Sequence, residues 1–206
     1  MAIVNGYGTR TQLEKLLKGA EFSGTGHDDD TDRAIETASR WIDRETGRRF
    51  YEDSTVQTRY YTPTDWRHLE VDDISTDTGL LVTTDSQLDN TFETSWTVDD
   101  YSGSFGFRLQ PENEGAPWNR LEALSGSWPL LRRAVKIVAK FGYAAVPTEV
   151  EHACLMLAVR LYKRKDSPFG VLEFPSAGAV ERLPRMDPDI ANTIGHLRRF
   201  ARVDAA

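Results

Sequence analysis

The chain has 206 residues, of which 39% are hydrophobic and 28% are charged, and its formal net charge is −7. This is the composition of a globular protein long enough to bury a core, and it excludes a disordered or fibrous chain. The longest apolar run, residues 153–159, is much shorter than the ~20 residues of a membrane span, and residues 1–12 lack the pattern of a signal peptide. The single cysteine, Cys154, excludes an intramolecular disulfide. We therefore expect a chain folded in a reducing cytoplasm, without membrane contact.

Charge is distributed unevenly along the chain. Residues 51–130 contain 15 acidic and 4 basic residues, whereas residues 131–206 contain 8 acidic and 13 basic residues. An acidic segment repels polyanions, and the basic C-terminal third is suited to a polyanion or to an acidic partner. Solvated faces that differ in sign by chance are the alternative explanation.

Two helices are predicted before residue 50. Thr11 and Glu14 have the spacing of a capping box and mark the start of a short first helix. The second helix begins in residues 27–32, whose carboxylates suit the positive end of the helix dipole, and Gly47 is its left-handed C-cap. A metal site is the alternative interpretation of residues 27–32, but the turn glycine and final glutamate of a calcium loop are missing there.

Between residues 51 and 131 the pattern changes to short segments rich in β-branched and aromatic residues, separated by Asp, Gly, Pro and Ser. No helical stretch interrupts them, which favours an antiparallel sandwich or barrel over alternating β–α units. The predicted strands are residues 55–61, 69–71, 80–83, 94–98, 105–109 and 132–141.

Pro147 opens a helix that is apolar around nearly its whole circumference. Leu155 and Met156 lie outside its main apolar stripe, so we expect this helix to pack against a neighbouring chain as well as against its own core. Its C-terminal end carries basic residues that suit the helix dipole and can contact a protein or a phosphate, namely Arg160, Lys163 and Arg164.

Residues 171–185 are expected to form an irregular arm, and a last helix is predicted from Asp187 and Pro188. The arm and the chain end offer apolar and basic side chains for docking onto a partner, namely Phe169, Leu172, Phe174, Arg198, Arg199 and Arg202. The alternative is that the arm folds back on its own chain and that the arginines only complement the helix dipole.

The sequence contains neither a nucleophile elbow nor a phosphate-binding glycine loop, and its histidines lack metal-ligand spacing. We therefore predict no catalytic, cofactor-binding or metal-binding residues. An enzyme is the competing class, as a small hydrolase whose pocket gathers His68, Asp72, Asp73 or Asp99. A second competitor is a small nucleic-acid-binding module that uses residues 131–206.

The switch from helical spacing to alternation and back predicts an α+β fold, with a small helical bundle built from both chain ends and an inserted antiparallel β domain. We expect helices in residues 1–50, the acidic β domain in residues 51–131, and a strand, a long helix, the arm and a last helix in residues 132–206.

The order of these elements resembles the head-to-tail connector (adaptor) proteins of tailed bacteriophages, in the form with an inserted β domain. The resemblance covers residues 10–203 and rests on Glu-Thr-Gly-Arg-Arg-Phe at 45–50, the acidic β segment, Lys-Ile-Val-Ala-Lys-Phe-Gly-Tyr at 136–143, the helix opened by Val146-Pro147, Ser-Pro-Phe-Gly at 167–170 and Asp187-Pro188.

The resemblance implies a structural virion protein without enzymatic activity or cofactor. It implies a ring of identical chains, typically twelve, located in the virion neck between the capsid portal and the tail. The implied partners are further copies of the chain, the portal protein, the next neck or tail protein, and DNA that passes through the channel without sequence-specific binding.

Overall fold

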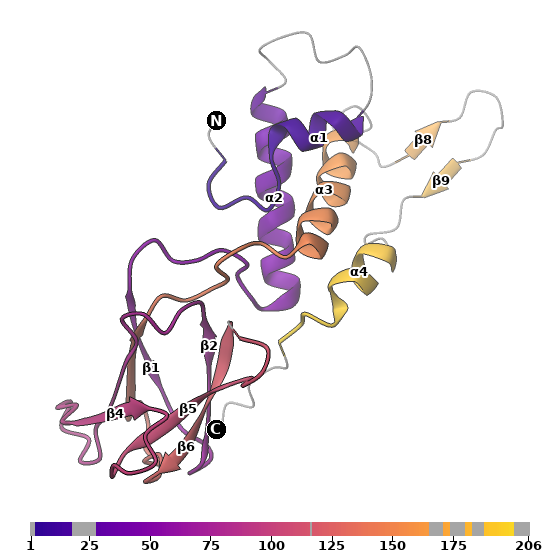
Figure 1. Cartoon of the computed structure of the whole chain (residues 1–206). Helices are drawn as coiled ribbons and strands as arrows, with labels where there is room; N and C mark the ends of the chain where they lie inside the picture. Colours follow the sequence, from indigo (N-terminus) through magenta and orange to yellow (C-terminus); the bar gives the residue numbers. More distant parts are fainter. Residues whose placement is uncertain are drawn as a thin grey trace. The chain divides into compact units, whose positions relative to one another are not determined.

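The structure is a computed structural model that describes residues 3–17, 28–115, 117–164, 171–173, 180–182 and 188–199, with only the backbone described in 171–173 and 180–182 (Figure 1). Its contacts divide the chain into two compact units. The helical unit comprises Met1–Arg48 and Val146–Phe200, and the β unit comprises Arg49–Ala145. Within the described residues, no helix is both long and apolar enough to cross a membrane.

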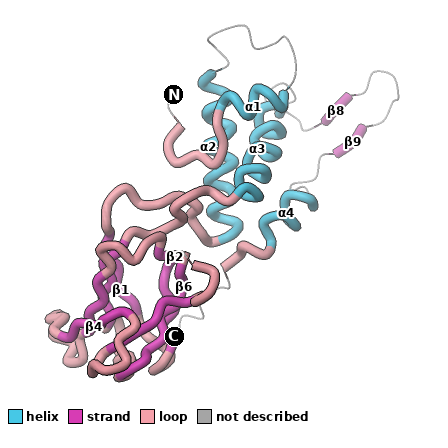
Figure 2. The backbone as a smooth tube through the Cα atoms, in the orientation of Figure 1, coloured by secondary structure: helices cyan, strands magenta, loops and turns pink. Residues whose placement is uncertain are grey.

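The helical unit contains α1 (Arg10–Leu17), α2 (Asp28–Thr46), α3 (Thr148–Lys163) and α4 (Pro188–Gly195) (Figure 2). α2 and α3 pack against each other, and both helices bury small side chains, such as Ala38 in α2 and Ala158 in α3. The buried Ser39 hydroxyl lies 3.4 Å from the Cys154 sulfur at this contact. Arg10 joins α1 to α2 by donating two hydrogen bonds, of 3.0 and 2.7 Å, to the buried Asp32 carboxylate. The predicted start and end of α2 are confirmed, and Gly47 has a φ of 66°.

The cap of α1 differs from the prediction. The Thr9 backbone amide donates to Gln12 Oε1 at 2.8 Å, and the Gln12 amide donates to Thr9 Oγ1 at 3.4 Å. The capping pair is therefore Thr9 and Gln12 rather than Thr11 and Glu14, because the helix begins at Arg10.

The β unit is a seven-stranded sheet with the order β1-β7-β3-β4-β5-β6-β2, antiparallel except for the parallel pair β4 and β5. A bridge between Ile74, at the end of β2, and Phe141, just after β7, curls the sheet into a nearly closed barrel. Its core is aromatic, with Trp96 stacked on Trp128 at 4.0 Å between ring centroids. The strands are β1 (Gln57–Tyr61), β2 (His68–Ile74), β3 (Leu81–Thr84), β4 (Thr94–Val98), β5 (Gly106–Gln110), β6 (Trp118–Ser125) and β7 (Val135–Ala139).

Two features of the sheet differ from the prediction. β6 was not predicted, and it pairs with both β2 and β5. The strand expected in 132–141 was grouped with the C-terminal helices, whereas β7 lies inside the sheet between β1 and β3. Its alternating pattern buries Val135, Ile137 and Ala139, and those side chains belong to the core of the β unit.

The expected irregular arm contains regular structure. β8 (Val171–Glu173) and β9 (Val180–Arg182) pair as antiparallel strands. The other residues of the arm lie outside the described residues. α4 begins at Pro188, as predicted from Asp187-Pro188, and buries Ile190 and Ile194.

Candidate assembly surface

The predicted contact residues of α3 divide into one buried and one exposed side chain. Leu155 is 8% exposed, and a Cβ placed on Gly8 would lie 2.7 Å from its Cδ2 atom. Leu155 therefore packs inside its own chain. Met156, one residue further, is 39% exposed. A step of one residue rotates a side chain by about 100° around a helix, and this separates the two.

The basic residues at the end of α3 lie at the negative end of its dipole. Lys163 and Arg164 are exposed and Arg160 is half-buried. Together with Met156 they make an exposed surface of one apolar and several cationic side chains, which we call the α3 face.

A second exposed surface follows α2 and was not predicted. Its residues recur at spacings of three and four, so they share one side of the helix and line a hollow of about 330 Å³. Trp41 is half-buried there, while Arg33 and Arg44 are exposed. A tryptophan flanked by arginines is a combination enriched in protein interfaces. This α2 stripe consists of Arg33, Glu36, Thr37, Arg40, Trp41 and Arg44.

The C-terminal arginines that the structure describes contact their own chain. Arg198 forms an ion pair with Glu45 of α2, and the Arg199 backbone amide donates to Thr46 O at 2.8 Å. His196 Nε2 lies 3.2 Å from Glu149 Oε1. For Arg198 the contact is therefore the fold-back alternative rather than an acidic group on a partner.

Four other predicted contacts cannot be placed on this surface. Phe169, Phe174 and Arg202 lie outside the described residues, and Leu172 lies in β8, where only the backbone is described.

The carboxylates and the histidine proposed for a hydrolase are engaged in separate contacts. His68 Nδ1 lies 3.1 Å from Asp65 Oδ2, and Asp99 Oδ1 accepts from Arg108 at 3.3 Å. Asp73 is buried, and its backbone carbonyl accepts from the Gly142 amide at 2.7 Å. General acid–base chemistry needs a carboxyl or imidazole within reach of a substrate and of its catalytic partner. In these contacts His68 pairs with Asp65, which is not one of the hydrolase candidates, rather than with Asp73 or Asp99.

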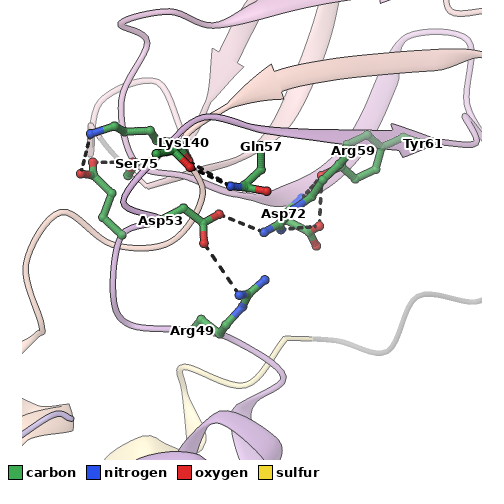
Figure 3. A network of polar contacts seen from close by, with 10 residues as sticks. Arg49, Asp53, Gln57, Arg59, Tyr61, Asp72, Ser75 and Lys140 are labelled. Carbon is green, nitrogen blue, oxygen red and sulfur yellow. Dashed lines mark hydrogen bonds and ion pairs between the residues drawn. The ribbon is translucent and has the colours of Figure 1, made fainter. Parts of the chain in front are cut away.

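Asp72, the remaining hydrolase candidate, belongs to a polar network centred on Arg59 (Figure 3). Arg59 Nη1 donates to Asp72 Oδ2 at 2.8 Å, and its Nη2 donates to Asp53 Oδ2 at 3.2 Å. The Tyr61 hydroxyl also donates to Asp72 Oδ2, at 3.0 Å, and the guanidinium lies 3.8 Å from the centre of the Phe141 ring. Arg59 thus pairs with both Asp72 and Asp53, and Arg49 Nη1 also lies 3.8 Å from Asp53 Oδ1, so these carboxylates are held in a structural arrangement.

A second part of this network surrounds Glu52. The Ser75 hydroxyl donates to Glu52 Oε1 at 2.8 Å, and Lys140 Nζ lies 3.2 Å from Glu52 Oε2. These two contacts, the serine hydrogen bond first, lower the pKa of the Glu52 carboxyl. The network therefore ties residues 52–53, where the chain enters the β unit, to β1, β2 and the end of β7.

Three carboxylates in the β3–β4 loop lie close enough to suggest a cation, because oxygens of Asp85, Asp89 and Glu93 are within 4.8 Å of one another. The buried Asp85 carboxylate instead accepts hydrogen bonds from the backbone amides of the loop, namely residues 87, 88 and 90. These hydrogen bonds to the loop backbone explain why the Asp85 carboxylate is buried there. In residues 27–32, Asp28 and Asp32 form ion pairs with Arg10 at 2.6 and 2.7 Å.

Neither a family model nor a curated protein matches the chain. Solved structures do match it, and each match covers 100% of this chain and 96% of the other. A chain from the neck of an empty gene transfer agent particle, computed with C6 symmetry, is 16% identical with a TM-score of 0.58. A chain from the neck of the native particle, computed with C12 symmetry, is 18% identical with a TM-score of 0.53, and one from the native virion is 19% identical with a TM-score of 0.52. The chain therefore shares its fold, helices and sheet together, with chains of these particles.

Proposed function

We propose that the chain is a structural protein of a virion neck and forms a ring adaptor between the capsid portal and the tail, with a channel through which DNA passes. The observation that carries this proposal is the likeness over the full length of the chain to chains from particle necks. Those necks were computed with C6 and C12 symmetry, which supports a ring of identical copies. We propose twelve copies in the ring.

The helical unit has two different exposed surfaces that suit such a ring. The α3 face offers Met156 beside Lys163 and Arg164, and the α2 stripe offers Trp41 between arginines. A ring closes through head-to-tail contacts, in which two unlike surfaces of each copy meet. The α3 face and the α2 stripe carry the methionine, tryptophan and arginine side chains that are enriched in protein interfaces, and since both are cationic, each suits an acidic surface of a neighbouring copy.

The charge of the chain suits a channel for DNA. With a net charge of −7, the chain as a whole repels phosphates. Binding that depends on phosphate contacts is therefore weak, and DNA slides through instead of being held. The neck position makes the portal and the next neck or tail protein the other partners.

A matched pair of substitutions tests the ring. Leu155→Asp places a charge among buried side chains and should destabilise the monomer by several kcal/mol, about 3 or more. Met156→Asp places the same charge on an exposed position, so the melting temperature of the monomer should stay within a few degrees of the wild type while ring formation with purified portal is lost. Native mass spectrometry gives the number of copies. Rings that form equally with Met156→Asp would show that the α3 face is free of subunit contacts.

Substitutions in the arm test whether it contacts the portal. Truncation after Asp166 would also remove α4, which buries Ile190 and Ile194. The variant Phe169→Ala/Leu172→Ala/Phe174→Ala keeps α4 and removes only apolar anchors. We expect it to form rings but to dissociate from portal faster than the wild type, since buried apolar anchors control dissociation. Arg198→Ala is the control, because Arg198 already pairs with Glu45.

A further inference from the structure

One outward-facing row of the sheet crosses four strands of the β unit. Tyr60 of β1 is paired with Lys136 of β7, Lys136 with Thr83 of β3, and Thr83 with Ser95 of β4. Directly paired residues lie on the same side of a sheet. The neighbours of these residues along the strands, among them Val82, point into the core, so the row lies on the side of the sheet away from the core. Thr83, in the middle of the row, is itself buried, whereas Tyr60 at its β1 end is exposed.

Two aromatic rings and two cations gather at one end of this row. The rings of Tyr60 and Phe92 are 5.6 Å apart and tilted by 49°. The Arg133 guanidinium lies 4.7 Å from the centre of the Tyr60 ring, and Lys136 Nζ lies 4.7 Å from the centre of the Phe92 ring. Tyr60 is 44% exposed and Arg133 is exposed. We call these four residues the cation–aromatic patch.

The backbone holds Arg133 in a conformation that few non-glycine residues adopt. Its φ is 58°, and its amide donates to Thr62 Oγ1 at 2.9 Å. In this backbone conformation the Arg133 guanidinium lies over the Tyr60 ring.

The patch is unusual in the electrostatics of its unit. The four arginines between residues 51 and 130 all form ion pairs, namely Arg59 with Asp53 and Asp72, Arg67 with Glu122, Arg108 with Asp99 and Glu112, and Arg120 with Glu70. Arg133 and Lys136 lie over aromatic rings instead, and no carboxylate of the described residues forms an ion pair with either. Positive charge is thus open to a partner here, within a unit whose residues 51–130 carry 15 acids and 4 bases.

The chemistry of the patch favours an acidic protein surface over nucleic acid. Two cations within an acidic unit make too few phosphate contacts to hold DNA. Exposed tyrosine and arginine are typical of a protein contact. The β unit itself supplies exposed carboxylates outside the ion pairs named above, namely Asp77, Asp89, Glu93 and Glu114, and these make its acidic surface.

We propose that the cation–aromatic patch docks onto the acidic surface of the β unit of a second copy of this chain. This inference rests on the proposed ring, because an interface between unlike surfaces repeats around a closed ring. It assigns the β unit a part in subunit contact in addition to the surfaces of the helical unit.

Charge reversal tests the proposal. Lys136→Glu should weaken assembly by at least about tenfold without changing the melting temperature of the monomer, and Tyr60→Ala should speed dissociation. Lys15→Glu is the matched control, since it makes the same charge change at an exposed position of α1. Rings that form equally well with Lys136→Glu overturn this inference alone, whereas a wild-type chain that forms no ring with portal overturns the proposed function and the inference with it.

Photo-crosslinking identifies the partner. A benzophenone amino acid at position 60, in a mixture of isotopically heavy and light chains, should give heavy–light products within residues 51–130. Products confined to one chain, or products with portal, overturn the proposal. Binding to a short fluorescent DNA duplex tests the alternative partner. DNA binding by the wild type that is lost in Lys136→Glu would overturn the proposal in favour of a nucleic-acid contact.

Discussion

The acidic segment of the β unit, residues 51–130, pairs all its arginines with carboxylates, whereas the helical unit has both paired arginines, such as Arg10 and Arg198, and exposed ones. In the β unit, each arginine between residues 51 and 130 is paired with a carboxylate, and Arg59 pairs with two carboxylates at once. In the helical unit, Lys163, Arg164, Arg33 and Arg44 are exposed on the α3 face and the α2 stripe. The contrast teaches where to look for partners, because charge that is satisfied within a unit contributes to its own structure, and open charge is available for contact.

The cores differ as well. The helical unit packs α2 against α3 and buries alanines in both, with Ser39 and Cys154 between them, whereas the β unit fills its barrel with large rings such as Trp96 and Trp128. Substitutions that shorten a buried side chain should therefore destabilise the β unit most, and substitutions that enlarge a buried side chain should destabilise the helical unit most.

The largest effect is expected for Trp128→Ala. Trp128 is 1% exposed, stacks on Trp96, and its Nε1 donates to Arg67 O at 3.1 Å. Removing the ring should lower the free energy of unfolding by about 3–5 kcal/mol. Tryptophan fluorescence reports mainly on the β unit, because four of the five tryptophans lie in it, and circular dichroism at 222 nm reports on the helices. Trp66→Ala, at an exposed position, is the control, and an equal loss in both variants would contradict the aromatic core.

Ala38→Leu should have the next largest effect. Ala38 is fully buried in the contact between α2 and α3, and a larger side chain forces the helices apart. We expect a loss of about 1–3 kcal/mol in the free energy of unfolding, measured by urea denaturation. Thr37→Leu places the same leucine at the neighbouring exposed position and should leave stability nearly unchanged. If Ala38→Leu is also neutral, the helices do not pack through their small residues.

The Cys154 thiol gives a smaller, pH-dependent effect. Burial raises the pKa of this thiol to about 11. The folded chain keeps the proton between the ordinary thiol pKa, about 8.5, and this raised value, whereas the unfolded chain releases it. Stability should therefore fall as the pH rises through this window, and Cys154→Ala should remove that part of the fall. Urea midpoints of both chains at pH 8 and pH 10 measure it, and identical pH dependence would mean that the thiol is not buried.

Arg198→Ala should have the smallest effect on stability. Arg198 pairs with Glu45 at a partly exposed position, and such pairs contribute less than about 1 kcal/mol. Thermal unfolding of this variant and of Glu45→Ala should show small and similar shifts. A much larger shift for Arg198→Ala alone would mean that the arginine has a contact besides Glu45.

The sequence predicts elements best where several local signals agree. In α2, acidic residues at the start, helical spacing and Gly47 at the end all indicate the same helix, and the structure confirms it. β6 was missed because Leu121, Glu122 and Ala123 are good helix formers, and it is a strand only because β2 and β5 pair with it on either side.

The candidate surface could be predicted only in part, for a similar reason. Leu155 and Met156 are both apolar, and only the segment around Gly8, far away in the sequence, decides that Leu155 is the covered one. The pairing of Arg198 with Glu45 joins residues 153 positions apart, which no local pattern reveals. The α2 stripe did have a local signal, since its arginines and Trp41 recur with helical spacing on one side.

The chain enters and leaves the β unit at adjacent points. The Asp53 amide donates to Phe141 O at 2.8 Å, and Gly142, with a φ of 107°, lies so close to Tyr51 that a Cβ would be 1.8 Å from its carbonyl oxygen. The entropy cost of a connection depends on how far apart its two ends are held. Because the two ends of the barrel are adjacent, the barrel joins the helices on either side as a short loop would. A module whose ends meet in this way can be gained, lost or exchanged in evolution without rebuilding its host.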